Sequence, residues 1–191
     1  RGRPPGTPRM SSALDNFLAL LDLEPLEVNL FRGQSRSPGW GRVYGGQVLA
    51  QALVAAGRTV EEQRPAHSMH AYFLLAGDVG APIVYQVDRA RDGGSFTTRR
   101  VVAVQHGQPI FVSTVSFHRD EPGFEHAASP PAAPGPDGLR TERDMALEAR
   151  DLLPEPLRSV LTAEQPIEYR PVDPVNPLAP TPSAPAANRT G

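Results

Sequence analysis

Residues 12–21 carry the period of an α-helix. Their apolar side chains recur at intervals of three and four residues, which places them on one helix face: Leu14, Phe17, Leu18 and Leu21. Ser12, three residues before Asp15, resembles a capping box at the start of this run. The pattern predicts a short amphipathic helix that packs on the edge of a sheet.

A second helical segment begins at Gly45 and Gly46, and it is apolar all round. No charged residue occurs from Val48 to Ala56, which is typical of a helix that is buried on most sides. Gln47 and Gln51 are four residues apart and share one stripe of this helix. Because buried amides need partners, we expect the stripe to meet polar groups or a ligand.

Four strand-like runs follow, rich in β-branched and aromatic residues: 67–77, 82–90, 96–105 and 110–119. Tight turns with the sequences RDGGS (91–95) and HGQP (106–109) join the last three runs. This arrangement predicts an antiparallel meander. A long buried helix combined with such a sheet predicts an α+β fold of the hotdog type, in which an antiparallel sheet wraps around a central helix.

Proline indicates the domain boundaries, because each proline removes a backbone donor and fixes φ. Residues 1–10 hold three prolines, residues 11–119 hold five and residues 120–191 hold fourteen. We expect a disordered extension (1–10), an N-terminal hotdog domain (11–119) and a Pro/Gly-rich linker (120–140). Short helices and a strand-like run at 166–172, the start of a second repeat, are expected within 141–172. A disordered Pro-rich tail is expected over 173–191.

Composition excludes several classes of protein. The chain has no Cys, which excludes a disulfide scaffold and a cysteine nucleophile, and all 19 of its basic residues are Arg. The net charge of −2 argues against a nucleic-acid partner. No apolar run approaches the ~18 residues of a transmembrane helix, so no membrane partner is expected. The sequence indicates no metal or organic cofactor, and without a visible targeting segment we expect a cytoplasmic location.

Several motifs suggest chemistry without carrying it. The glycines of GWGRVYGG (39–46) fail the dinucleotide-binding spacing, and there is no G-x-S-x-G nucleophile elbow. His67 and His70 are three residues apart on one predicted strand, so they should face opposite sides and not share a metal. Arg99 and Arg100 should also face opposite sides. One of them could meet a phosphate, although a solvated or paired arginine is the default.

The glycines at the start of the second helix leave two interpretations open. Helix starts carry free N–H donors and a partial positive charge, which would suit the oxyanion of a thioester under attack. Alternatively, Gly45 and Gly46 only permit a tight turn from strand to helix. The sequence does not decide between the two interpretations.

Several separate motifs resemble the N-terminal half of the acyl-CoA thioesterase II family. The resemblance covers residues 14–176, in order and with few gaps. Its motifs are LFRGQS (30–35), YGGQVLAQAL (44–53), HSMHAYFL (67–74), RDGGSFTTRRV (91–101), QPIFVSTVSF (108–117) and PIEYRPV (166–172). The resemblance implies a double hotdog, with two tandem repeats in one chain.

The resemblance also implies an activity, which is the hydrolysis of acyl-CoA to free fatty acid and CoA by an activated water. In the family an Asp, a Ser or Thr, and a Gln activate this water, and all three belong to the second hotdog. No position of this chain matches them, so the catalytic residues remain unknown. The residues that the resemblance implies for substrate binding are Gly45, Gly46, Gln47, His67, Arg91, Asp92, Gly93, Ser95 and Phe96.

The second repeat is missing from this chain, so we expect one complete hotdog and an uncovered surface. Large exposed apolar patches drive association, which favours a homo-oligomer or pairing with a separate C-terminal hotdog half. The alternatives are a non-catalytic acyl-CoA-binding or oligomerising hotdog module, or a truncated inactive remnant. A single-hotdog dehydratase or hydratase is disfavoured, because the central helix carries no acid and no histidine.

Overall fold

The structure is a computed structural model that describes residues 12–36, 39, 41–130, 132–155 and 157–174. It divides into two compact units, one of residues 1–126 with 164–166 and the other of the remaining residues. Each unit is considered by itself. The expected N-terminal extension, and all but residues 173 and 174 of the expected tail, lie outside the described residues.

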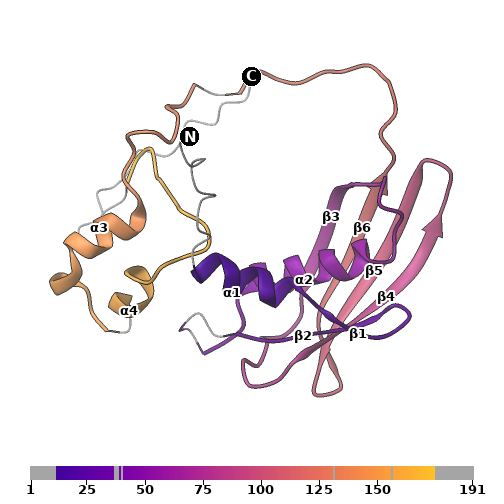
Figure 1. Ribbon diagram of the computed structural model, residues 1–191, viewed down its shortest axis with the longest axis horizontal. Coiled ribbons are helices and arrows are strands. Elements are labelled where there is room, and N and C mark those ends of the chain that lie inside the picture. The colour runs from indigo at the N-terminus through magenta and orange to yellow at the C-terminus, as the bar shows by residue number, and fades with distance from the viewer. Residues whose placement is uncertain (1–11, 37–38, 40, 131, 156, 175–191) are drawn as a thin grey trace, which may run out of the picture. The chain divides into compact units, whose positions relative to one another are not determined.

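The first unit is an α+β hotdog domain, as the sequence predicted (Figure 1). Its elements are α1 (Ser12–Leu21), β1 (Glu24–Glu27), β2 (Leu30–Gly33), α2 (Gly45–Gly57), β3 (Ala66–Phe73), β4 (Ile83–Asp92), β5 (Phe96–Gln105) and β6 (Gln108–His118). The strand order is β1-β2-β4-β5-β6-β3, and every neighbouring pair is antiparallel. The predicted meander is therefore confirmed as β4-β5-β6, and β3 forms one edge of the sheet.

Strand boundaries differ from the predicted ones for local reasons. The run predicted as 67–77 ends as a strand at Phe73, because Leu74 and Leu75 both donate their backbone N–H to the carbonyl of Ile110. The turn predicted over 106–109 involves only His106 and Gly107, both with positive φ, so β6 begins at Gln108. The two short strands β1 and β2 were not predicted.

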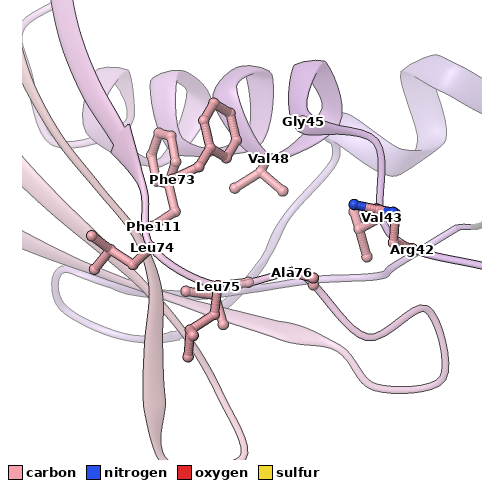
Figure 2. Close-up of a pocket in the computed structure, with 11 residues that line it drawn as sticks. Arg42, Val43, Gly45, Val48, Phe73, Leu74, Leu75, Ala76 and Phe111 are labelled. Atoms are coloured by element: carbon pink, nitrogen blue, oxygen red, sulfur yellow. The ribbon is translucent and has the colours of Figure 1, made fainter.

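Helix α2 crosses the inner face of the sheet, and its small residues make the contact. The chain rises through Arg42 and Val43 and enters the helix at Gly45 (Figure 2). Ala52, Ala55 and Ala56 are completely buried. Leu53 on the opposite side is 38% exposed, so one side of the helix remains open to solvent.

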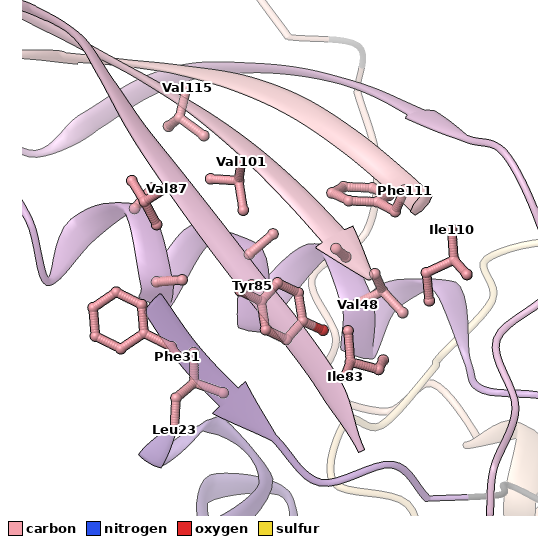
Figure 3. Packing of buried hydrophobic residues seen from close by; sticks show 14 of the residues in the cluster. Leu23, Phe31, Val48, Ile83, Tyr85, Val87, Val101, Ile110, Phe111 and Val115 are labelled. Carbon is pink, nitrogen blue, oxygen red and sulfur yellow. The ribbon is translucent and has the colours of Figure 1, made fainter. Parts of the chain in front are cut away.

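The core fills the space between α2 and the sheet. Strand β5 alternates, with its odd-numbered residues 97–105 buried toward the helix. Figure 3 shows the large side chains that pack there: Phe31, Val48, Ile83, Tyr85, Val101, Phe111 and Val115. This packing fixes both ends of α2 relative to the strands.

The second unit contains α3 (Glu142–Glu148), a 3-10 turn (Arg150–Leu152) and α4 (Leu157–Leu161). Thr141 caps α3, because its hydroxyl accepts a hydrogen bond from the N–H of Asp144. The strand expected at 166–172 does not form, and its Pro166 and Pro171 lack the N–H that a ladder needs. Within the described ranges, no helix combines the length and apolar character that crossing a bilayer requires.

Candidate functional site

The predicted substrate-binding residues fall into two groups at opposite ends of α2. Gly45, Gly46 and Gln47 form its first turn. The second group lies near the other end of the helix, where Arg99 contacts both Thr59 and Asp92. This group contains His67, Arg91, Asp92, Gly93, Ser95 and Phe96. The helix alone spans roughly 18 Å at 1.5 Å per residue, so the two groups do not form one site within this domain.

A pocket of about 360 Å³ adjoins the first group. Figure 2 shows it between the start of α2 and the segment that follows β3. Its lining residues are Arg42, Val43, Gly45, Val48, Phe73, Leu74, Leu75, Ala76, Gly77, Ile110 and Phe111. Arg42 is the single charged residue among these, and the rest is apolar. Such a lining accepts an alkyl chain with a polar group at its rim.

Two backbone donors are left without a partner among the described residues where α2 begins. The N-cap residue Tyr44 makes no side-chain capping hydrogen bond, and its carbonyl accepts from the N–H groups of Gln47 and Val48. The N–H groups of Gly45 and Gly46 have no acceptor within the part of the chain that the structure describes. Neither glycine has a positive φ. Their importance is therefore steric, since a Cβ on Gly45 would lie 3.1 Å from the ring of Phe73.

The glutamine stripe of α2 meets protein groups, which is one of the two outcomes expected for it. Gln47 donates to the carbonyl of Gln34 at 2.9 Å. Gln51 is fully buried, donates to the carbonyls of Leu20 and Gln34, and accepts from the Tyr85 hydroxyl at 2.7 Å. Burial raises the pKa of Tyr85 above its ordinary value, so the phenol stays neutral and remains a donor. The stripe thus holds α1 and β4 on the helix.

The second group surrounds the turn between β4 and β5. The N–H of Gly93 donates to the carbonyl of Phe96, and Arg64 donates to the Gly93 carbonyl at 2.7 Å. The carboxylate of Asp92 pairs with Arg99. The Arg91 guanidinium has no hydrogen bond or ion pair within the described chain. The turn therefore presents one uncommitted cation, while its acid is already paired.

Aromatic rings gather beside this turn, on the face of the sheet opposite α2. The ring of Phe96 is 4.3 Å from that of His118 and 5.8 Å from that of His67, measured between centroids. His67 also contacts the Ser116 hydroxyl at 2.9 Å. Nearby, hydrogen bonds from Ser95 and Arg119 lower the pKa of Glu121. Together these contacts tie the start of β5 to the end of β6.

The prediction that His67 and His70 face opposite sides of the sheet is wrong. A bulge between Ala66 and Ser68 shifts the alternation of β3. His67 contacts Ser116, and His70 pairs with Thr114, which is on the same face as Ser116. Even so, the described residues contain no group of three His, Cys, Asp or Glu side chains that could hold a metal ion.

The arginine pair behaves as the alternation predicted. Arg99 is buried against α2 and fully hydrogen bonded, whereas Arg100 is exposed on the other face. The sequence reading missed the pocket-lining segment 73–77, because its apolar residues looked like the continuation of a strand. The two hydrogen bonds to the carbonyl of Ile110 turn that segment away from the sheet. Nothing in the local sequence predicts these two hydrogen bonds.

Comparison with known proteins agrees with this architecture. The family model "Acyl-CoA thioesterase N-terminal domain" matches residues 34–118. Human acyl-coenzyme A thioesterase 8 is 43% identical over 188 residues, which cover 94% of this chain and 57% of that protein. Acyl-CoA thioesterase 2 of Haemophilus influenzae is 43% identical over 161 residues, covering 84% of this chain and 56% of that protein.

Solved structures give the same result. The acyl-CoA thioesterase II TesB2 of Mycobacterium marinum is 46% identical, with a TM-score of 0.58 over 65% of this chain and 46% of that one. The sheet wrapped around α2 makes this domain a hotdog domain of the thioesterase type. Residues 34–118 match the N-terminal domain of acyl-CoA thioesterases, and the chain is similar over this hotdog domain to acyl-CoA thioesterase II proteins. It spans just over half the length of the two curated relatives named above.

The packing of Gln51 against Gly33 predicts that any side chain at position 33 destabilises the domain. A Cβ on Gly33 would lie 2.8 Å from three side-chain atoms of Gln51, which is held by partners on several sides. We expect Gly33→Ala to lower the free energy of unfolding by about 1–3 kcal/mol, as overpacking does. Urea unfolding measures this value.

The control for Gly33→Ala is Gly57→Ala, because nothing lies within 4 Å of a Cβ at that position. In a Gln51→Ala background the obstacle is gone, so Gly33→Ala should then cost little. An equal loss in both backgrounds would refute the steric explanation.

Proposed function

We propose that this chain binds acyl-CoA and forms one half of a thioesterase that releases free fatty acid and CoA by means of an activated water. The observation that carries the proposal is the apolar pocket beside the unpaired N–H groups of Gly45 and Gly46. An acyl chain fits the lining, and its thioester carbonyl then reaches the helix start. There the two N–H groups would stabilise the developing oxyanion, each being worth about 3–4 kcal/mol in the transition state.

The water-activating group has to come from outside the pocket. Its described lining contains no carboxylate, histidine or hydroxyl side chain. General-base catalysis needs such a group within hydrogen-bonding reach of the water. We therefore assign the catalytic Asp, Ser or Thr, and Gln of the family to a second hotdog domain. This domain, whose origin we leave open, faces the start of α2.

Edge strand β3 is the surface where we place that second domain. One edge of β3 pairs with β6, and its other edge has no strand partner among the described residues. Exposed edges of this kind are templates for pairing. Its end and the segment beyond it carry exposed apolar side chains, which are 51–61% accessible: Tyr72, Phe73, Leu74 and Leu75. The partner is a second copy of this chain or a separate C-terminal hotdog.

Antiparallel pairing of two β3 edges would also reunite the divided site. In such a pair, the beginning of one strand lies opposite the end of the other. The beginning of β3, where His67 lies beside Phe96 of β5, would then approach the end of β3 at Phe73 in the partner domain. On this proposal, the two groups of substrate-binding residues serve one ligand from different domains.

A second candidate is a binding module without turnover. The same lack of an acid or base in the pocket lining favours it. Such a chain would bind and release acyl-CoA unchanged, or would only support assembly; a truncated inactive remnant would do neither.

CoA release from acyl-CoA, followed with a thiol-reactive dye, distinguishes these candidates. The chain has no Cys, so the dye reports only product. We expect saturable binding by the chain alone, with release of CoA only when a catalytic second domain is present. Release by the chain alone would contradict our placement of the catalytic group, and an absence of binding would contradict the proposal itself.

The acyl pocket predicts a specific effect of bulk at Gly45. In Gly45→Val the side chain would meet the ring of Phe73 and narrow the pocket. We expect affinity for a thioether analogue of acyl-CoA to fall on the order of tenfold, as removal of well-placed contacts does. Gly57→Val on the same helix, with open space around it, is the matched control. Equal affinities for the two variants in calorimetry would exclude the pocket as the acyl site.

Pairing through the β3 edge predicts the number of chains in the particle in solution. Light scattering at micromolar concentration should give at least two chains, and Tyr72→Glu should reduce this to one by placing a charge in the interface. Leu26→Glu introduces the same charge on exposed β1 at the other edge of the sheet and should leave the mass unchanged. A single-chain mass for the unaltered protein would exclude pairing with a second copy and leave the separate C-terminal half.

A further inference from the structure

Arg99 differs from every other arginine that the structure describes by its burial. It lies on the face of β5 that points to α2, and 1% of its side chain is exposed. Its neighbour Arg100 faces solvent. Moving a guanidinium out of water is costly unless each donor finds an acceptor. A buried arginine is therefore tolerated only where every N–H of its guanidinium has an acceptor.

The guanidinium of Arg99 connects three separate segments. Its Nε donates to the hydroxyl of Thr59 at 2.8 Å, and its Nη2 donates to the Thr59 carbonyl at 3.0 Å, just beyond the end of α2. Nη1 donates to the carbonyl of Arg91 at 2.9 Å and to that of Thr98 at 3.0 Å. Nη2 also pairs with the carboxylate of Asp92. One planar fork thus joins the helix end to both strands of the β4–β5 hairpin.

The hairpin needs this support, because its strand pairing is irregular at that point. The register between β4 and β5 shifts between Asp88 and Arg91. Beyond the shift, the ladder alone fixes the turn less firmly. Arg99 donates a hydrogen bond to the backbone carbonyl of Arg91, and Arg64 donates one to the backbone carbonyl of Gly93 at 2.7 Å. The turn therefore takes its position from two arginines anchored in the domain.

We infer that Arg99 is the positioning residue of the β4–β5 turn. The carboxylate of Asp92 is then the partner of Arg99 and does not contact the ligand. This inference rests on the proposed function, in which the group that contains Arg91 and Phe96 contacts the acyl-CoA ligand, and it adds that the cation of Arg91 meets the phosphate-bearing end of CoA. With Arg99 in place, the backbone of Arg91 is held before the ligand arrives, and with it the point at which the uncommitted Arg91 side chain leaves the turn. Preorganisation of this kind lowers the cost of ordering the turn on binding.

The test measures two affinities of the full chain, one for free CoA and one for a saturated fatty acid as a probe of the distant pocket. Arg99→Met should weaken CoA binding on the order of tenfold and leave fatty-acid binding unchanged. Arg100→Met, the adjacent and exposed control, should change neither affinity. Thr59→Val keeps the shape of the side chain while removing one acceptor, and it should weaken CoA binding in the same direction by a smaller factor.

Arg91→Ala separates a failure of this inference from a failure of the proposed function. If Arg91→Ala leaves CoA affinity unchanged, the turn is not a CoA contact and both proposals for it fall. If Arg91→Ala weakens binding while Arg99→Met and Thr59→Val do not, the positioning role alone is overturned. Parallel loss of CoA and fatty-acid binding in both positioning variants would show a merely structural role, and this too would overturn the inference.

Discussion

The close packing of α2 on the sheet is the constraint on which the rest of the domain depends. Ala52, Ala55 and Ala56 are fully buried, and because they carry no bulk the helix axis can approach the strands. Larger residues would push the helix away and force the surrounding core out of good rotamers. The position of the helix in turn sets the pocket at its start and the hairpin contact at its end.

Buried polar groups fix where α2 stands along its axis, which apolar packing alone would leave loosely specified. Gln51 meets Tyr85 at the middle of the helix, and Arg99 meets Thr59 beyond its end. A hydrogen bond has a direction and a short range, and leaving either group unpaired in the core would be costly. A shift of the helix by one turn would break both anchors, so the distance between the pocket and the hairpin is set by the fold.

The sequence predicted the elements whose period was clear and missed those defined by long-range contacts. The uncharged run 48–56 and the alternation of 96–105 are long and regular, so helix α2 and strand β5 were found. Strand β1 is four residues long and includes a proline, and its pairing partner gives it strand structure. His67 and His70 were placed on opposite faces because a bulge leaves no mark in the pattern. For the site, the motifs supplied the residues, but their order along the chain did not reveal that α2 separates them.

That separation bears on how the proposed activity is divided. In the proposed function, the apolar pocket holds an acyl chain and the two free backbone donors beside it polarise the carbonyl, yet the described pocket lining contains no carboxylate, histidine or hydroxyl side chain to act as a base. Binding and proton transfer are different physical tasks, since the first needs a dry surface and the second a polar, hydrogen-bonded base. In the proposed function, this domain performs the first task and a partner domain performs the second. The exposed apolar end of β3 lies beside the pocket, so a partner docked there would deliver its base where the carbonyl lies.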